Sequence, residues 1–168
     1  CCDKEDNLFM MCRDTEHPVV MLDARGNYVK NFGKGLFQEV HSLCVTEEDT
    51  LLCVDTGLHV VRELTKDGEW IRDLGNLGVP SDSGFEKDVW RRMQRRGKIV
   101  PTDVAFDKGW SFWAGVQTIR RAAPPFNRPT GVCMGPKGDI FVSDGYGNAA
   151  VHRCSKDGTL LRTWGGPG

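Results

Sequence analysis

The stretch that decides the fold runs from residue 60 to residue 75. It reads Val60-Val61-Arg62-Glu63-Leu64-Thr65-Lys66-Asp67-Gly68-Glu69-Trp70-Ile71-Arg72-Asp73-Leu74-Gly75. Two runs containing aliphatic, β-branched and aromatic residues flank an Asp-Gly pair, which supplies the positive φ that a tight hairpin turn needs. The stretch therefore predicts two short antiparallel strands joined by a tight turn, with a glycine closing the second strand.

The same pattern occurs twice more in the chain. Gly26 and Gly158 occupy the turn position of Gly68, 42 residues before it and 90 residues after it. The second spacing is two periods of 42 plus six residues. Three or four short strands per ~40–45 residues are typical of one blade of a β-propeller. We therefore predict an all-β chain with blades near residues 1–35, 36–77 and 127–168.

Residues 78–126 interrupt this repeat and are interpreted as an insertion or a degenerate blade. Within them, 101–115 is either a further blade or a lid, and Asp88–Arg96 is a candidate short helix. The basic cluster within 91–98 favours a solvated surface, with phosphate or an acidic partner as the alternative. A β-sandwich is the alternative fold, but it does not predict a 42-residue repeat. An α/β fold is excluded because no regular helices separate the strands.

Charge and hydropathy exclude two classes of partner. The formal net charge is −1 over 168 residues, which gives no general electrostatic attraction to nucleic acid or to a membrane surface. The apolar runs fall far short of the ~18 residues of a membrane span. We therefore expect neither nucleic acid nor membrane as a partner.

The seven cysteines favour free thiols over a disulfide framework. Their number is odd, they form no CxxC motif, and Cys53 and Cys133 lie in apolar runs that predict buried thiols. The given chain shows no signal peptide. These features favour a reducing, cytoplasmic location.

Three local motifs carry a resemblance to a known family. They are 126–132 followed by 139–148, 35–37 leading to 40–43, and Arg13 with 17–20. In these motifs the chain resembles the NHL-repeat β-propellers, and among them the peptidyl-α-hydroxyglycine α-amidating lyases and their bacterial relatives. The resemblance implies a six-bladed ring, of which 168 residues make a part.

The resemblance also assigns site residues. In that family three histidines near the propeller axis hold a zinc ion, and an arginine and a tyrosine act beside it. Arg13 matches the active-site arginine, His41 the first zinc histidine and Tyr146 the catalytic tyrosine. The other two zinc histidines are expected in later blades, after Gly168. Gly147 stands where the family has a cysteine, so the local disulfide is not expected.

A calcium ion is a further cofactor implied by the resemblance. Only the backbone carbonyl of Leu43 matches a calcium ligand of the family.

Each assigned residue has a structural alternative. His41 is alternatively a strand residue near the axis, and Tyr146 a turn aromatic that packs on the next blade. Arg13 is alternatively a surface partner of Asp14 or Glu16.

Three further histidines are not expected to be ligands. His17 and His59 share a blade position and are predicted to be loop or rim residues. His152 lies beside Arg153 in a predicted strand and is expected to be exposed.

Two functions from different classes follow. The first is a zinc-dependent carbon–nitrogen lyase that expels an amide from a hemiaminal in a peptide or small molecule and leaves an aldehyde. There the tyrosine acts as the base, and the arginine holds an anionic substrate group or stabilises the tyrosinate. The alternative is a non-catalytic NHL propeller that serves as a peptide- or protein-binding scaffold. Because an open array leaves unpaired edges, two chains are expected to close a ring as a homodimer, the alternative being a fragment.

Overall fold

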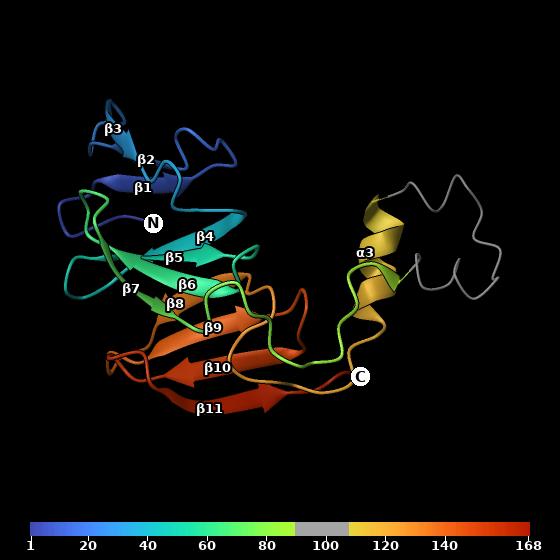
Figure 1. Cartoon of the computed structure of the whole chain (residues 1–168). Coiled ribbons are helices and arrows are strands. Elements are labelled where there is room, and N and C mark those ends of the chain that lie inside the picture. The colour runs from blue at the N-terminus through green and yellow to red at the C-terminus, as the bar shows by residue number, and fades with distance from the viewer. Residues whose placement is uncertain (90–107) are drawn as a thin grey trace.

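The computed structural model describes residues 1–89 and 108–168, and its strands form three antiparallel sheets (Figure 1). In each sheet the strands follow one another in chain order. The first sheet contains β1 (Leu8–Met11), β2 (Val19–Leu22) and β3 (Tyr28–Phe32). The second contains β4 (Val40–Val45), β5 (Leu51–Asp55), β6 (Val60–Leu64) and β7 (Trp70–Leu74). The third contains β8 (Gly131–Met134), β9 (Ile140–Asp144), β10 (Ala150–Cys154) and β11 (Leu160–Gly165).

The three sheets stack so that the first strand of each meets the first strand of the next. Strand β4 contacts both β1 and β8, and the second sheet lies between the other two (Figure 1). This is the arrangement of three consecutive blades of a β-propeller. The turn glycines Gly26, Gly68 and Gly158 all have positive φ, as the Asp-Gly pattern predicted.

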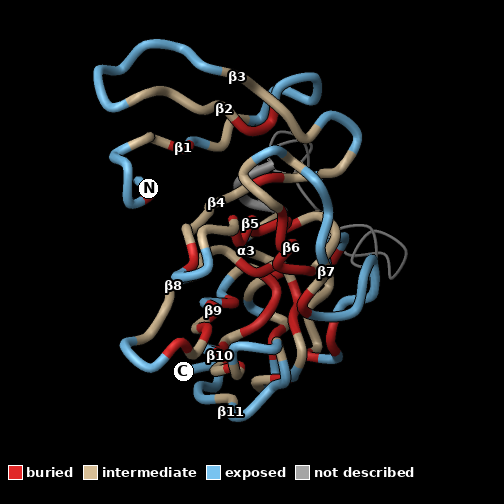
Figure 2. The backbone as a smooth tube through the Cα atoms, turned by 90° about the vertical axis from the view of Figure 1, so that its left-hand side faces the viewer, coloured by how far each residue is buried: buried red, intermediate tan, exposed pale blue. Residues whose placement is uncertain are grey.

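The middle blade is buried on both faces, which explains the continuous apolar run in β5. Leu51 and Cys53 join a cluster with Phe9 of the first blade. Leu52 and Val54, which alternate with them, join a cluster that includes residues of the third blade. Successive side chains of a strand point to opposite faces, so a strand buried on both sides must be apolar throughout. Figure 2 shows this buried centre.

Helix α3 (Lys108–Val116) lies beyond one end of the blades (Figure 1). Residues 108–115, expected as part of a further blade or a lid, are thus helical. The rest of that candidate segment, 101–107, lies outside the described residues. So do the basic cluster within 91–98 and the expected helix beyond Val89.

Apolar side chains remain exposed on the last strand of each blade. They are Tyr28 and Val29 on β3, Trp70 and Ile71 on β7, and Leu160, Leu161 and Trp164 on β11. Among the described residues, no helix is long and apolar enough to cross a membrane.

All seven cysteines are free, but they are not all buried. Cys53 is fully buried, and burial raises the pKa of its thiol to about 12. Cys133 is exposed, so the prediction of a buried thiol is wrong there. The apolar run around Cys133 belongs to β8, the first strand of its blade, which has only one strand beside it within its sheet. The run is therefore covered less completely than the one in β5.

Asp3 ties the N-terminal segment to the second blade and makes stability sensitive to acid. Its side chain has 0% exposure and lies 3.0 Å from Lys66 Nζ. Burial opposes ionisation of Asp3, but hydrogen bonds from Asn7 and Lys66 outweigh it and lower its pKa to about 2. Because this folded-state pKa is below the unfolded value, the stabilisation is present above about pH 4.

We expect this contribution, about 1–2 kcal/mol, to disappear as the pH falls from 4 to 2. Urea unfolding at pH 6 and pH 2.5 should therefore show a smaller pH-dependent loss for Asp3→Asn than for the unmodified chain. Asp67→Asn, at a highly exposed side chain, is the matched control. An equal pH dependence of Asp3→Asn and the unmodified chain would contradict the prediction.

Candidate functional site

His41 sits at an irregularity of strand β4. Val40 pairs with Asp55 and Ser42 pairs with Val54, so His41 is an extra residue between two successive pairs. A bulge of this kind redirects a side chain and is common beside functional sites. Here His41 Nε2 lies 3.2 Å from the hydroxyl of Tyr146. The two rings meet edge to face at a centroid distance of 5.2 Å.

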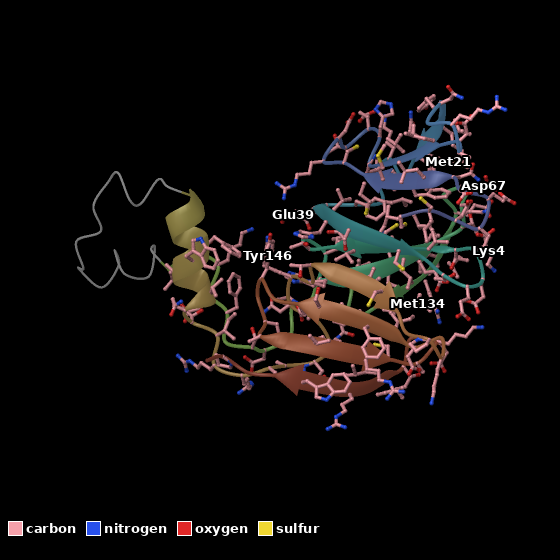
Figure 3. All side chains as sticks on the ribbon, turned by 180° about the vertical axis from the view of Figure 1, so that it is seen from behind. Lys4, Met21, Glu39, Asp67, Met134 and Tyr146 are labelled. Carbon is pink, nitrogen blue, oxygen red and sulfur yellow. The ribbon has the colours of Figure 1, made fainter. Side chains whose placement is uncertain are left out.

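Tyr146 reaches this contact from the loop between β9 and β10, in the third blade. Its ring also packs edge to face on Phe112 of helix α3, at a centroid distance of 5.0 Å. The loop is held by a hydrogen bond from the Gly147 N–H to the Asn127 carbonyl, 3.0 Å long. From the third blade, Tyr146 thus contacts the second blade through His41 and the insertion through Phe112. Tyr146 lies at the end of the blades nearest α3 (Figure 3).

The segment that leads into His41 is held by the buried carboxylate of Asp55. This side chain accepts backbone N–H groups from both sides: Gln38 and Glu39 before β4, and Gly57 and Leu58 after β5. The carboxylate is completely shielded from solvent. Hydrogen bonds to a charged acceptor are stronger than neutral ones, so Asp55 sets the path of the chain two residues before His41.

Asp144 has the corresponding role in the third blade. It accepts hydrogen bonds from the Asn127 N–H, from Asn148 Nδ2 at 2.9 Å, and contacts His152 Nε2 at 3.2 Å. His152 is fully buried, and its Nδ1 lies 2.9 Å from Thr163 Oγ1. The expectation that His152 is exposed is therefore wrong. Both of its ring nitrogens find partners, which allows a polar side chain to occupy an inward position of β10.

Arg13 is exposed and lines a different cavity from the His41–Tyr146 contact. That cavity has a volume of about 100 Å³ and is bounded by 12–15, Pro18 and 37–40. Asp14 pairs with His17 and Glu16 with Lys34, so neither expected surface partner engages Arg13. The structure therefore brings His41 and Tyr146 together and places Arg13 near the segment that precedes His41.

The other two histidines lie in loops, as expected. His17 is exposed and contacts Asp14. His59 lies in the turn between β5 and β6 with φ of 60°, and its Nδ1 accepts the Arg128 N–H at 3.0 Å.

The described residues offer part of a zinc site. Nδ1 of His41 is buried without a hydrogen-bond partner, so one nitrogen is free to bind a metal. Zinc in proteins takes three or four protein ligands. Within 1–89 and 108–168, no three His, Cys, Asp or Glu residues are grouped to hold a metal ion. These residues alone therefore do not complete a zinc site.

Two features that shape this region were not predicted from the sequence: the buried carboxylates of Asp55 and Asp144, and the ring of Phe112. Asp55 and Asp144 are each the last residue of the second strand of a four-stranded blade. This shared position in the repeat could have identified them from the sequence. Phe112 belongs to a segment without repeat or motif, so its contact with Tyr146 had no signal in the sequence.

Comparison with known proteins identifies a known repeat in the third blade. A family model described as the NHL repeat matches residues 126–154, which contain β8, β9, β10 and Tyr146. Residues 126–154 are an NHL repeat. The chain is 27% identical over 151 residues to peptidyl-alpha-hydroxyglycine alpha-amidating lyase 1 of Drosophila melanogaster. It is 26% identical over 157 residues to peptidyl-glycine alpha-amidating monooxygenase A of Xenopus laevis.

These alignments cover 89% and 76% of the chain, but 21% and 17% of the relatives. The chain thus spans about a fifth of the length of the curated relatives that it matches. The resemblance expected from the sequence, to NHL-repeat propellers and amidating lyases, is confirmed.

Two solved structures confirm the propeller fold around the NHL repeat. The virginiamycin B lyase of Staphylococcus aureus, solved as a catalytically inactive variant with quinupristin, matches with a TM-score of 0.57 and 12% identity. This match covers 100% of the chain and 40% of the lyase. A streptogramin B lyase matches with a TM-score of 0.57 and 14% identity, over 99% of the chain and 39% of that lyase. At these identities the likeness concerns the fold, and it confirms the predicted all-β partial propeller.

Proposed function

We propose that the chain forms part of a carbon–nitrogen lyase that acts on peptides ending in α-hydroxyglycine. The observation that carries the proposal is the contact between His41 Nε2 and the Tyr146 hydroxyl, 3.2 Å long and made between two blades. The amidating-lyase relatives support the same reaction class. In this reaction the hydroxyl of the hemiaminal loses its proton, the carbon–nitrogen bond breaks with its electron pair going to nitrogen, and the nitrogen takes up a proton and leaves as a peptide amide. The remaining fragment is the aldehyde glyoxylate.

The residues of the chain divide this work. Tyr146 accepts the hydroxyl proton, a role that requires its oxygen to lie near a positive charge that favours the phenolate. Arg13 is permanently charged and unpaired with the acidic groups beside it, so it is suited to hold the anionic end of the substrate. His41 is proposed as one zinc ligand, with the others supplied from outside residues 1–89 and 108–168. A calcium ion near the Leu43 carbonyl and a homodimer that closes the ring stay predictions.

Turnover and metal content test this proposal together. The chain, together with the segments that supply the other zinc ligands, is supplemented with zinc and incubated with a peptide ending in α-hydroxyglycine. Mass spectrometry follows the peptide amide, and metal analysis counts bound zinc. We expect His41→Ala to lose both zinc and turnover, and His17→Ala, at an exposed histidine, to keep both. Lack of amide formation above the uncatalysed rate by this zinc-supplemented protein would refute the proposal.

A second candidate function is a non-catalytic propeller that binds a peptide or a protein. It is favoured by the apolar residues exposed on the last strands, such as Trp70 at 57% and Leu161 at 52% exposure. Apolar residues of this kind are enriched at the centre of protein interfaces. This function predicts no turnover. It also predicts that Tyr146→Phe leaves the fold and the affinity for the bound peptide or protein unchanged.

A further inference from the structure

A second cavity lies at the junction of the second blade, the third blade and the insertion. Its volume is about 240 Å³, and neither His41 nor Tyr146 lines it. Charged and imidazole groups on its wall come from Glu39, His59, Lys87 and Arg128, and Pro80 and Phe85 add apolar surface. Glu39 lies at the end of the blades that faces α3, as Tyr146 does (Figure 3).

Two residues of this wall have strained backbones. His59 has φ of 60° and Arg128 has φ of 63°, both in the left-handed region that side-chain-bearing residues rarely adopt. The strained pair is linked, because the Arg128 N–H donates to His59 Nδ1 at 3.0 Å. Such strain is unfavourable and is concentrated at active sites and ligand clamps. The surrounding structure thus holds Arg128 and His59 in unfavourable backbone conformations.

Arg128 and His59 both carry hydrogen-bond donors and both line the cavity. Arg128 donates through Nη2 to Glu39 at 2.8 Å, whereas its Nε is buried without any partner. A buried donor without a partner is unfavourable. Burial, and then the charge of Arg128, lower the pKa of His59, so its ring is neutral at neutral pH. Because Nδ1 accepts a hydrogen bond, Nε2 carries the proton and is a donor.

The charges on the wall favour an anion. Among the residues that line the cavity, Glu39 neutralises one of the two cations, Arg128 and Lys87, and one positive charge remains. The buried carboxylates of Asp55 and Asp144 also act on His59. A guanidinium binds planar carboxylates through several parallel donors. The apolar rings of Pro80 and Phe85 suit a flat hydrocarbon attached to that carboxylate. A volume of this size is below that of drug-sized pockets and fits a small ligand.

We propose that this cavity binds a small aromatic carboxylate, held by Arg128, Lys87 and His59, with its ring against Phe85. The site is separate from the His41–Tyr146 contact, and the proposal does not depend on the lyase activity.

Benzoate and benzamide are the probes, because they share a ring and differ in charge. Chemical-shift titration of the whole chain should show saturable binding of benzoate and no saturation with benzamide. Arg128→Gln should weaken benzoate binding by about tenfold or more, since a hydrogen bond to a charged group is lost. Lys87→Gln, at an exposed position, should weaken it by about two- to fivefold. Arg121→Gln, at an exposed arginine paired with Asp82, should leave it unchanged.

Two results would overturn the proposal. One is equal saturation by benzoate and benzamide, and the other is unchanged benzoate affinity in Arg128→Gln. If circular dichroism shows that Arg128→Gln does not fold, Lys87→Gln decides the question together with the salt dependence of the unmodified chain. An affinity that neither the Lys87 substitution nor added salt reduces would then overturn it.

Discussion

Replacing Asp55 with alanine is expected to lower the free energy of unfolding by about 3–4 kcal/mol. The carboxylate of Asp55 is fully buried and accepts four backbone N–H groups, those of Gln38, Glu39, Gly57 and Leu58. Alanine would leave these donors inside the protein without an acceptor, and water would have to enter to satisfy them. The segment before β4 would also lose its anchor, which displaces His41.

Chemical denaturation measures this loss, and the His41 ring resonances report the displacement. Asp67→Ala is the matched control, because Asp67 is 83% exposed and its ion pair with Lys30 lies at the surface. Surface ion pairs contribute about 0–1 kcal/mol, so this variant should unfold close to the unmodified chain. Equal stability of the Asp55 and Asp67 variants would show that the buried hydrogen bonds of Asp55 contribute far less to the free energy of unfolding than expected.

Replacing Tyr146 with phenylalanine is expected to reduce lyase turnover by about 100-fold or more, without loss of the fold. General acid–base groups typically contribute about 10²–10⁴-fold to rate, and this substitution removes only the hydroxyl. The ring contacts with His41 and Phe112 need no hydroxyl, so the loop after β9 should keep its place. Single-turnover rates over a range of pH are the measurement, because a lost base also changes the shape of the pH profile.

Tyr28→Phe is the control for this substitution. Tyr28 is the other tyrosine of the chain, it is 61% exposed on β3, and its hydroxyl accepts only a surface hydrogen bond from Asn31. Turnover by Tyr28→Phe should equal that of the unmodified chain. A Tyr146→Phe variant with full turnover would refute the proposed base.

The turn chemistry made the fold readable from the sequence. Gly26, Gly68 and Gly158 recur at related spacings, and each holds the positive φ that the pattern demands. A turn is decided by residues adjacent in the chain, so its signal survives without tertiary information. The continuous apolar run of β5 similarly reflects burial on both faces.

Side-chain environments were harder to predict from the sequence, because they depend on contacts with residues that are distant in the chain. His152 lies beside a charged residue in its strand, yet Asp144 and Thr163 satisfy its ring in the interior. Cys133 lies in an apolar run, yet it is exposed because β8 begins its blade. In each case the local pattern suggested one environment and the packing of other strands produced the opposite one.

The sequence by itself determined that this chain is built of propeller blades, because the repeat period, the strands and the turns depend on residues that lie close together in the chain. Through its resemblance to the amidating lyases it also predicted His41 and Tyr146 as site residues. Only the tertiary structure decided that these two side chains meet, since 105 residues separate them and a bulge in β4 redirects His41. The contact of Phe112 with Tyr146 and the cavity beside Arg128 likewise depend on how blades and insertion pack, which no local pattern encodes.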